Sequence, residues 1–395
     1  MTEVKKTITG LAAGHLVTDI YMSVIPAMLP LLILGHGYSY FMAGLLVTTY
    51  NLASSFTQPV LGWLADTKGI AVHVSYSLFI GAVFIAMMGF TGNYILLLIF
   101  AACAALGHAF YHPVALSLVS RLCSPDNRGR LTSYFVVGGN IGFSFGPVLA
   151  GAVLSGFGLP GVALLVIPAV IVAPILYRIL PPNLATAHPA PVRAGSDTPG
   201  TGHSWRPFIL LLAASTFRAW SIFAAIAFLP VYLVEKGYGL ATANLLVSAM
   251  LFAGVAGQIW GGGISDRYGR KEFILGALAL ALPAFYLFMM TDGIIEIAAL
   301  LVFGFALWST FSVAVAMSHE MMPGQIGLAS GMMLGFAMGI GGIGAAVNGV
   351  IADRVSLTAA LGTIPVPLVA ALILFAALPY PWKYGKNIFK THGTN

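Results

Sequence analysis

The stretch Gly262-Gly-Ile-Ser-Asp-Arg-Tyr-Gly-Arg-Lys271 has a shortened copy 200 residues earlier, Gly62-Trp-Leu-Ala-Asp-Thr-Lys-Gly69. Sliding the chain by the same 200 positions aligns further residues without a gap. They are Pro30 with Pro230, Gly37-Tyr38 with Gly237-Tyr238, and Gln58 with Gln258. One aligned glycine means little among 46 glycines, but a register that also keeps proline, Gly-Tyr, glutamine and aspartate indicates two related halves.

The chain around these two stretches is too apolar for a soluble protein. Of its 395 residues, 59% are hydrophobic and 8% are charged, whereas soluble domains have roughly 25% charged residues. Its mean hydropathy is +0.93, and a membrane-spanning helix needs about 20 mostly apolar residues. The apolar runs predict twelve spans, at residues 8–34, 40–64, 71–90, 94–120, 131–155, 161–181, 208–234, 241–264, 273–290, 295–319, 327–352 and 358–379.

The net charge of +6 is explained by membrane topology rather than by a nucleic-acid partner. With both termini on one side of the membrane, 15 of the 18 Lys and Arg residues fall on that side. Lys236 and Arg354 fall opposite, and Arg218 lies within a span. Because cytoplasmic loops are enriched in Lys and Arg, we expect a multi-pass protein of the inner (plasma) membrane, surrounded by lipid, with both termini in the cytoplasm.

One long polar stretch divides the chain. Residues 182–207 are rich in Pro, Gly, Ser and Thr and have no apolar periodicity, which is typical of a linker. The sequence therefore predicts a six-helix bundle at 1–181, a cytoplasmic linker at 182–207, a second six-helix bundle at 208–382 and a cytoplasmic tail at 383–395.

The stretch from Gly262 to Lys271 resembles the G-x-L-x-D-R-x-G-R-K/R signature of the major facilitator superfamily. The family carries its fuller version between spans two and three, whereas the first copy here lacks the arginines. The resemblance implies an all-α integral membrane protein with twelve transmembrane helices in two pseudo-symmetric six-helix bundles. The substrate site of such transporters lies near the bilayer midplane, between the halves.

Both copies of the stretch predict a gate at the cytoplasmic helix ends. Glycine lets helices approach closely where the chain turns, and an aspartate can cap a helix end or pair with a cation in one state only. A short basic turn that merely fixes topology is the alternative. The candidate gate residues, including two at the ends of spans four and ten, are Gly62, Asp66, Gly69, Gly262, Asp266, Arg267, Gly269, Arg270, Lys271, Arg121 and Glu320.

The fifth span carries a second motif. Gly142, Gly146-Pro147 and Gly151 resemble the G-x-x-x-G-P-x-x-G-G motif of drug/proton antiporters of this superfamily. Small residues four apart let helices pack closely in lipid, and a proline in a span kinks it. The motif favours antiport over import, although ordinary small-residue packing is the alternative.

Four segments resemble the fosmidomycin resistance protein family, and the likeness covers most of the chain. They are Gly14–Asp19, Tyr111-His112-Pro113, Gly138–Gly142 and Met317–Asp353. One departure is Val114, which stands where the family pattern has glutamate. The resemblance implies proton-driven export of small amphiphilic or anionic compounds, with the phosphonate fosmidomycin as the namesake.

Two charged residues fall in the middle of spans, which costs about 2.5–3.5 kcal/mol each on insertion scales. Asp19 lies in span one and Arg218 in span seven, at nearly equivalent positions under the shift of 200. We expect Asp19 to bind the coupling proton. We expect Arg218 to attract an anionic substrate or to pair with Asp19. A permanent structural ion pair between the halves is the alternative.

Three histidines in spans one and four bear on the proposed role of Asp19. His15 precedes Asp19 by one helical turn, and His108 and His112 repeat that spacing in span four. Histidine titrates near neutral pH and can relay a proton or bind a phosphonate, although a membrane histidine can also be a packing residue. The sequence predicts proton coupling by Asp19, His15 and His112. The predicted substrate-binding residues are Arg218, His108, Tyr111 and Asn140.

Three functions remain open at this point. The first is a proton-coupled exporter working by alternating access, and the second is an importer of a small organic solute or of copper on the same fold. Copper is considered because Met317, His319 and Met321 offer soft ligands. The third is a membrane enzyme or channel, against which the sequence has no zinc-protease motif, nucleotide-binding loop or Ser-His-Asp cluster. We expect a monomer that is not an enzyme and has no cofactor and no metal site.

Overall fold

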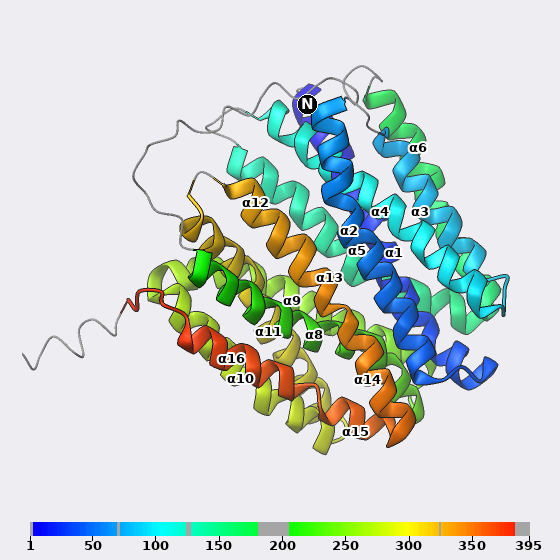
Figure 1. Ribbon diagram of the computed structural model, residues 1–395. Helices are drawn as coiled ribbons and strands as arrows, with labels where there is room; N and C mark the ends of the chain where they lie inside the picture. Colours follow the sequence, from blue (N-terminus) through cyan, green and yellow to red (C-terminus); the bar gives the residue numbers. More distant parts are fainter. Residues whose placement is uncertain (1–2, 69–71, 124–127, 181–204, 324, 384–395) are drawn as a thin grey trace, which may run out of the picture. The chain divides into compact units, whose positions relative to one another are not determined.

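The computed structural model describes residues 3–68, 72–123, 128–180, 205–323 and 325–383. Every regular element in these ranges is helical, and none of them contains a strand (Figure 1). The all-α fold expected from the sequence is therefore confirmed. The predicted linker, apart from its last residues, and the tail beyond position 383 lie outside the described residues.

The helices before the linker follow the predicted spans closely. They are α1 (Glu3–Pro30), η1 (Leu31–Gly35), α2 (Tyr40–Lys68), α3 (Val74–Met88), α4 (Tyr94–Leu122), α5 (Arg128–Phe157), η2 (Leu159–Val166) and α6 (Ile167–Ile179).

The helices after the linker are more often interrupted. They are α8 (Trp205–Glu235), α9 (Leu240–Tyr268), α10 (Arg270–Met290), α11 (Ile294–Met321), α12 (Ile326–Gly331), η3 (Met332–Ala337), α13 (Met338–Gly341), α14 (Ile343–Arg354), α15 (Leu357–Gly362) and α16 (Pro365–Ala377).

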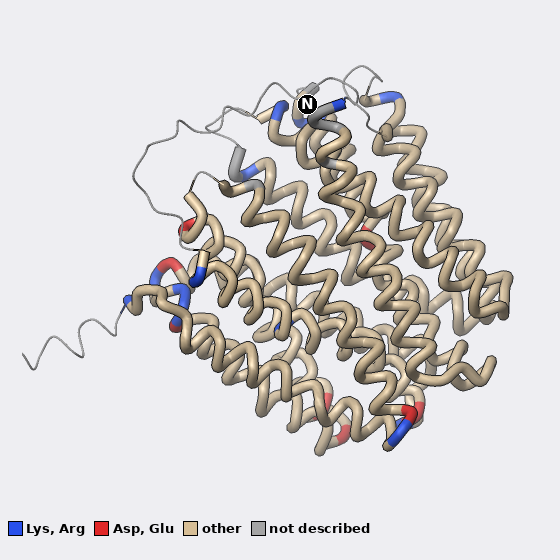
Figure 2. The backbone as a smooth tube through the Cα atoms, in the orientation of Figure 1, with Lys and Arg blue, Asp and Glu red and all other residues tan. Residues whose placement is uncertain are grey.

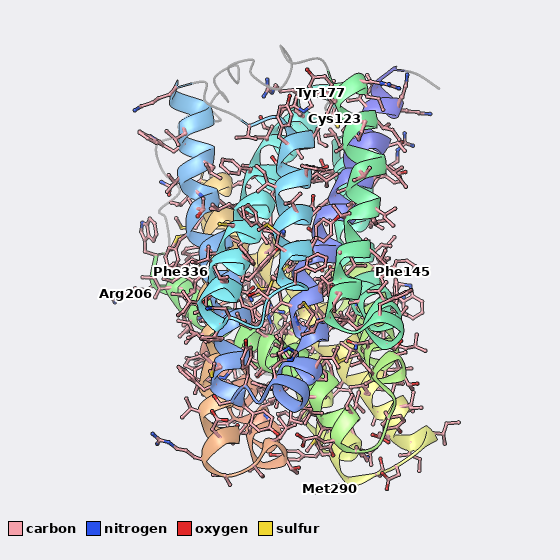
Figure 3. All side chains as sticks on the ribbon, turned by 90° about the vertical axis from the view of Figure 1, so that its right-hand side faces the viewer. Cys123, Phe145, Tyr177, Arg206, Met290 and Phe336 are labelled. Atoms are coloured by element: carbon pink, nitrogen blue, oxygen red, sulfur yellow. The ribbon has the colours of Figure 1, made fainter. Side chains whose placement is uncertain are left out.

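These helices suit a membrane. In the described part of the chain, ten helical segments are long and apolar enough to cross one. With the 29-residue α2 and the shorter apolar α3, the set is compatible with twelve spans. The middles of the long helices carry almost no charged residues (Figure 2). Large apolar side chains such as Phe145 of α5, which is 42% exposed, project from the helix surfaces (Figure 3), as expected where helices face lipid.

Contacts divide the chain into two compact units. Unit 1 comprises residues 1–192, 223–248 and 342–361, and unit 2 comprises residues 193–222, 249–341 and 362–395. In unit 1, α1 packs against α5, and α2 packs against α4 and α14. In unit 2, α10 packs against α11 and α16. The division into two six-helix bundles remains a prediction.

Glycines of the fifth-span motif bring α5 close to α1 within unit 1. A Cβ atom on Gly142 would collide with the backbone oxygen of Leu16, and one on Gly146 would collide with Ser23. One turn further along α5, a Cβ atom on Gly151 would lie 2.6 Å from Cβ of Asn244. Only glycine permits this spacing, so the motif has a packing role whatever it contributes to transport.

The repeated Gly-Tyr pairs adopt related conformations at helix ends. Gly37 has φ +70° and Gly237 has φ +104°, a region that side-chain-bearing residues avoid. The next backbone N–H reaches back to end each helix, from Tyr38 to Leu32 O at 3.2 Å and from Tyr238 to Leu233 O at 3.0 Å. The 200-residue repeat therefore has a counterpart in local structure.

A carboxylate from the distant α14 caps the start of α2 in unit 1. The two oxygens of Asp353 accept the backbone N–H groups of Tyr40 at 2.7 Å and Phe41 at 2.9 Å. The Tyr40 hydroxyl in turn donates to Glu235 Oε1 at 2.5 Å. A negative charge at a helix N-terminus is favourable, so these contacts fasten α2 to the ends of α8 and α14.

Candidate functional site

Asp19 of α1 lies among three imidazoles in unit 1. Its Oδ2 atom is 3.3 Å from His15 Nε2, one turn earlier on the same helix. Its Oδ1 atom is 3.3 Å from His112 Nε2 and 3.7 Å from His108 Nδ1, both on α4. We call these four residues the Asp–His cluster. The structure thus brings together all three residues predicted to couple protons and one predicted to bind substrate.

Backbone carbonyls fix the tautomers of two of the imidazoles. Nδ1 of His15 is 2.9 Å from the carbonyl oxygen of Phe135, and Nδ1 of His112 is 2.9 Å from that of His108. A carbonyl oxygen only accepts, so both Nδ1 atoms carry hydrogen. In a neutral imidazole the other nitrogen then has a lone pair.

Those two lone pairs face each other. Nε2 of His15 and Nε2 of His112 are 3.0 Å apart, a separation that suits a hydrogen bond but repels two bare acceptors. A proton on one nitrogen turns the repulsion into a donor–acceptor contact beside a carboxylate. The geometry of these two nitrogens and the Asp19 carboxylate is therefore compatible with binding one proton between them.

Packing holds the cluster away from bulk water. The ring of His15 stacks on Phe135 with centroids 4.3 Å apart, and its side chain is 8% exposed. A Cβ atom on Gly139 would lie 2.6 Å from Asp19 Oδ2 and would overlap the His15 ring. The His112 side chain is 23% exposed, so it is the member of the cluster that the outside reaches most easily.

Several polar atoms near the cluster lack a hydrogen-bond partner within the described chain. They are Asp19 Oδ1, His108 Nδ1, Thr18 Oγ1 and the Tyr50 hydroxyl. Thr18, Tyr50 and His108 line one small internal crevice. A buried polar atom without a partner costs about 1–3 kcal/mol, so binding a proton at this cluster would recover free energy.

Tyr111 and Asn140, which were also predicted to bind substrate, differ in burial. Tyr111 is fully buried, and its hydroxyl donates to the Leu11 carbonyl oxygen at 2.6 Å. It therefore holds α4 against α1. Asn140 is partly buried on α5, where its backbone oxygen accepts the Ser144 hydroxyl at 2.9 Å.

Arg218 of α8 is buried in unit 2, with 1% of its surface exposed. Its guanidinium lies over the ring of Phe311, 5.3 Å from the centroid. Nε and Nη1 have no hydrogen-bond partner among the described residues. A buried cation with unused donors is costly unless an anion reaches it. Whether it pairs with Asp19, which belongs to unit 1, remains a prediction.

Several candidate gate residues meet at one end of unit 2. Nη2 of Arg270 is 2.9 Å from Glu320 Oε1 and 3.5 Å from Asp266 Oδ1. The Tyr380 hydroxyl donates to Glu320, and burial together with that carboxylate raises the pKa of Tyr380. Lys383 Nζ donates to the Asp266 backbone oxygen at 2.6 Å.

The remaining residues of the second copy have different surroundings. Gly269 has φ +103° between α9 and α10, which only glycine tolerates well. Lys271 is buried, with Nζ 2.7 Å from the Leu378 oxygen and 4.4 Å from the centroid of Trp382. Arg267 lies over the ring of Tyr268, and a Cβ atom on Gly262 would meet open space.

The first copy of the gate stretch is only partly described. Gly69 lies outside the described residues, and the surroundings of Gly62 and Asp66 are likewise not described. Arg121, at the end of α4, donates to Ser117 Oγ at 3.2 Å. A gate role for these residues stays a prediction.

Sequence reasoning missed four residues that complete these sites. Phe135 and Phe311 pack on His15 and Arg218, and nothing in the sequence distinguishes them among its 25 phenylalanines. Tyr380 and Lys383 lie beyond the last predicted span and contact the candidate gate residues Glu320 and Asp266. The one available signal was that these two polar residues directly follow an apolar run.

Comparison with known proteins identifies the relatives of this chain. A sequence model of the Major Facilitator Superfamily matches residues 11–346 and, in a second match, residues 211–391. The chain is 32% identical over 375 residues to the fosmidomycin resistance protein of Escherichia coli (strain K12), covering 88% of this chain and 86% of that protein. It is 28% identical over 370 residues to the uncharacterized MFS-type transporter YfnC of Bacillus subtilis (strain 168), covering 91% and 90%.

Solved structures share the fold at low sequence identity. A bacterial homolog of the human lysosomal transporter Spinster, in an inward-facing and occupied conformation, has a TM-score of 0.79 and 17% identity and covers 98% of both chains. The peptide transporter POT in complex with sulfate has a TM-score of 0.74 and 16% identity, covering 98% of this chain and 95% of that one. At this identity the likeness concerns the fold alone.

Proposed function

The chain belongs to the major facilitator superfamily, and from that premise we propose that it is a proton-coupled antiporter that exports small anionic or amphiphilic compounds. It is a multi-pass membrane transporter and not an enzyme. The observation that carries the proposal is the Asp–His cluster, in which two imidazole lone pairs face each other at 3.0 Å beside a carboxylate.

Proton coupling follows from how the cluster stores charge. With one proton bound, the positive imidazolium and the negative Asp19 compensate each other in a region of low dielectric. Without the proton, two nitrogen lone pairs and a carboxylate lie close together. Their repulsion raises the free energy of the state in which α1 and α4 are closely packed. Protonation and deprotonation thus favour different separations of the two helices, and a transporter that alternates between two states can use that difference.

Arg218 supports an anionic cargo. A carboxylate, phosphate or phosphonate would take up the two guanidinium nitrogens that have no partner among the described residues. Phosphonate chemistry is suggested by the relative that is named for fosmidomycin resistance. Fosmidomycin is therefore the first compound to test, together with other small phosphonates.

The proposal also covers the direction of transport and the orientation of the protein in the membrane. The distribution of Lys and Arg supports an orientation with both termini in the cytoplasm, and the bacterial relatives support the plasma membrane as the location. The ion pairs among Asp266, Arg270 and Glu320 would then form part of a cytoplasmic gate. The glycines of α5 that contact α1 support export, because that motif resembles one of antiporters.

The decisive experiment measures fosmidomycin accumulation in proteoliposomes that contain the purified protein. Antiport predicts accumulation when the lumen is more acidic than the medium, because protons leave as substrate enters. Proton-driven import predicts accumulation under the opposite gradient. The same assay run with other phosphonates and with copper tests the remaining cargo alternatives.

Two matched variants assign the coupling to the cluster. Asp19→Asn should lose gradient-driven accumulation while retaining exchange of labelled for unlabelled substrate, because exchange needs substrate binding but no proton acceptor. Asp292→Asn makes the same chemical change at an exposed position between α10 and α11 and should behave as wild type. Full gradient-driven accumulation by Asp19→Asn would refute the assignment.

A further inference from the structure

The Asp–His cluster has the spacing of a preformed metal site. The Nε2 atoms of His15 and His112 are 3.0 Å apart, and each is 3.3 Å from an oxygen of Asp19. Zinc–nitrogen and zinc–oxygen bonds of about 2.0–2.2 Å at tetrahedral angles separate neighbouring ligand atoms by roughly 3.3 Å. The two nitrogens approach different oxygens of Asp19, Oδ2 and Oδ1, and one ligand atom from each of the three residues lies within 4.8 Å of the other two. A small shift of the Asp19 carboxylate therefore places three ligand atoms on one face of a coordination tetrahedron.

The groups behind these ligands also fit a metal. Metal-bound histidines almost always donate their second ring N–H to a carbonyl or carboxylate, which fixes the ring and its tautomer. Here His15 donates to Phe135 O and His112 to His108 O, both at 2.9 Å. Each leaves its Nε2 lone pair pointing into the cluster, so no rearrangement of hydrogen bonds is needed to bind an ion.

A fourth ligand is within reach. His108 is 92% buried, its Nδ1 atom has no hydrogen-bond partner among the described residues, and that atom lies 3.7 Å from Asp19 Oδ1. A small rotation of the His108 ring brings a third imidazole to the ion. His112, with 23% of its side chain exposed, leaves a route for an ion to enter.

We propose that the cluster binds one divalent transition-metal ion of the Zn²⁺ type, through His15, His112 and Asp19, with His108 completing the tetrahedron. Two or three imidazoles and one carboxylate suit Zn²⁺ and Co²⁺, whereas Mg²⁺ and Ca²⁺ require mostly oxygen ligands. Because the ligands come from α1 and α4, a bound ion holds these helices at one separation. Zn²⁺ should therefore inhibit transport, a consequence that rests on the proposed function, whereas binding itself does not.

The test is equilibrium binding of Zn²⁺ to the full-length protein in detergent, purified without a polyhistidine tag and measured by titration calorimetry. We expect one ion per chain, and replacement by Co²⁺ should give the visible absorption of a tetrahedral site. His112→Ala should weaken binding by roughly 100-fold, since loss of a ligand costs at least as much as loss of a second-shell partner. His36→Ala, which removes an exposed histidine at the end of η1 and outside the cluster, should leave binding unchanged.

Asp19→Asn keeps the size of the side chain and serves as the second variant if His112→Ala does not fold. Zn²⁺ binding that survives both substitutions in folded protein, or that disappears in His36→Ala, overturns the proposal. Absence of binding in a protein that still couples protons would overturn the metal site and leave the proposed function intact. Binding in a protein that shows no proton coupling would support the metal site and reject the proposed function.

Discussion

Replacing Arg218 by methionine should make the protein more stable and unable to carry its anion. Methionine keeps a similar length and an apolar stem but has no charge. Two guanidinium nitrogens lack partners among the described residues, and each costs about 1–3 kcal/mol when buried. The cation–π contact with Phe311 stabilises the buried guanidinium by only ~0.5–2 kcal/mol.

The net effect is a gain of about 1–4 kcal/mol without substrate, as for other buried charges replaced by apolar residues. For a chain of this size, that gain should raise the midpoint of thermal unfolding by roughly 2–6 °C. Loss of a buried charged hydrogen bond to the cargo costs about 2 kcal/mol or more. Affinity for fosmidomycin should therefore fall by roughly 30-fold or more.

The assays are thermal unfolding in detergent and substrate binding by calorimetry, with Arg218→Lys as the control that keeps the charge. Arg218→Lys should retain part of the binding and gain little stability. A loss of stability in Arg218→Met would mean that the guanidinium has a structural anion as partner. Unchanged fosmidomycin binding in that variant would reject Arg218 as the anion site.

Three further outcomes are expected. Gly142→Ala should lose about 1–3 kcal/mol of stability, because the added methyl group overpacks α5 against α1. Gly156→Ala, where a Cβ meets open space, should lose none. Thermal unfolding of the two variants checks this difference. Tyr380→Phe should lose about 1 kcal/mol near neutral pH with its bond to Glu320. Because the pKa of Tyr380 is raised above 10.0, the wild-type advantage is complete below pH 10.0 and shrinks as the pH rises through that raised value, which unfolding midpoints at rising pH will check. Asp353→Asn should lose about 1 kcal/mol, because the amide has no charge and only one oxygen to accept the two N–H groups at the start of α2. An unchanged unfolding midpoint would mean that the charge and the second hydrogen bond contribute nothing.

The sequence was informative wherever a single helix determines the geometry. His15 and Asp19 lie one turn apart, as do His108 and His112, so each pair shares a face of its helix. Asp266 and Arg270 have the same four-residue spacing, and their side chains approach to 3.5 Å. The aligned Gly-Tyr pairs indicated two related halves, and the structure gives both pairs related helix ends, because positive φ is a local property of glycine.

What could not be predicted depends on how helices are placed against each other. The register of α1 against α4 brings His112 to Asp19, and no local pattern encodes it. The acceptors at Phe135 and His108 are backbone atoms, which are the same in every residue. The capping of α2 by Asp353 joins positions 313 residues apart.

The main-chain acceptors behind the two imidazoles have a consequence for how this protein can change over generations. A side-chain acceptor disappears with one substitution, but the carbonyl groups of residues 108 and 135 persist whatever side chains those positions carry. Side-chain substitutions at these positions therefore leave the acceptors that orient the His15 and His112 rings in place. Under the proposed proton coupling, new cargoes can be acquired by altering other surfaces while the coupling site is inherited unchanged.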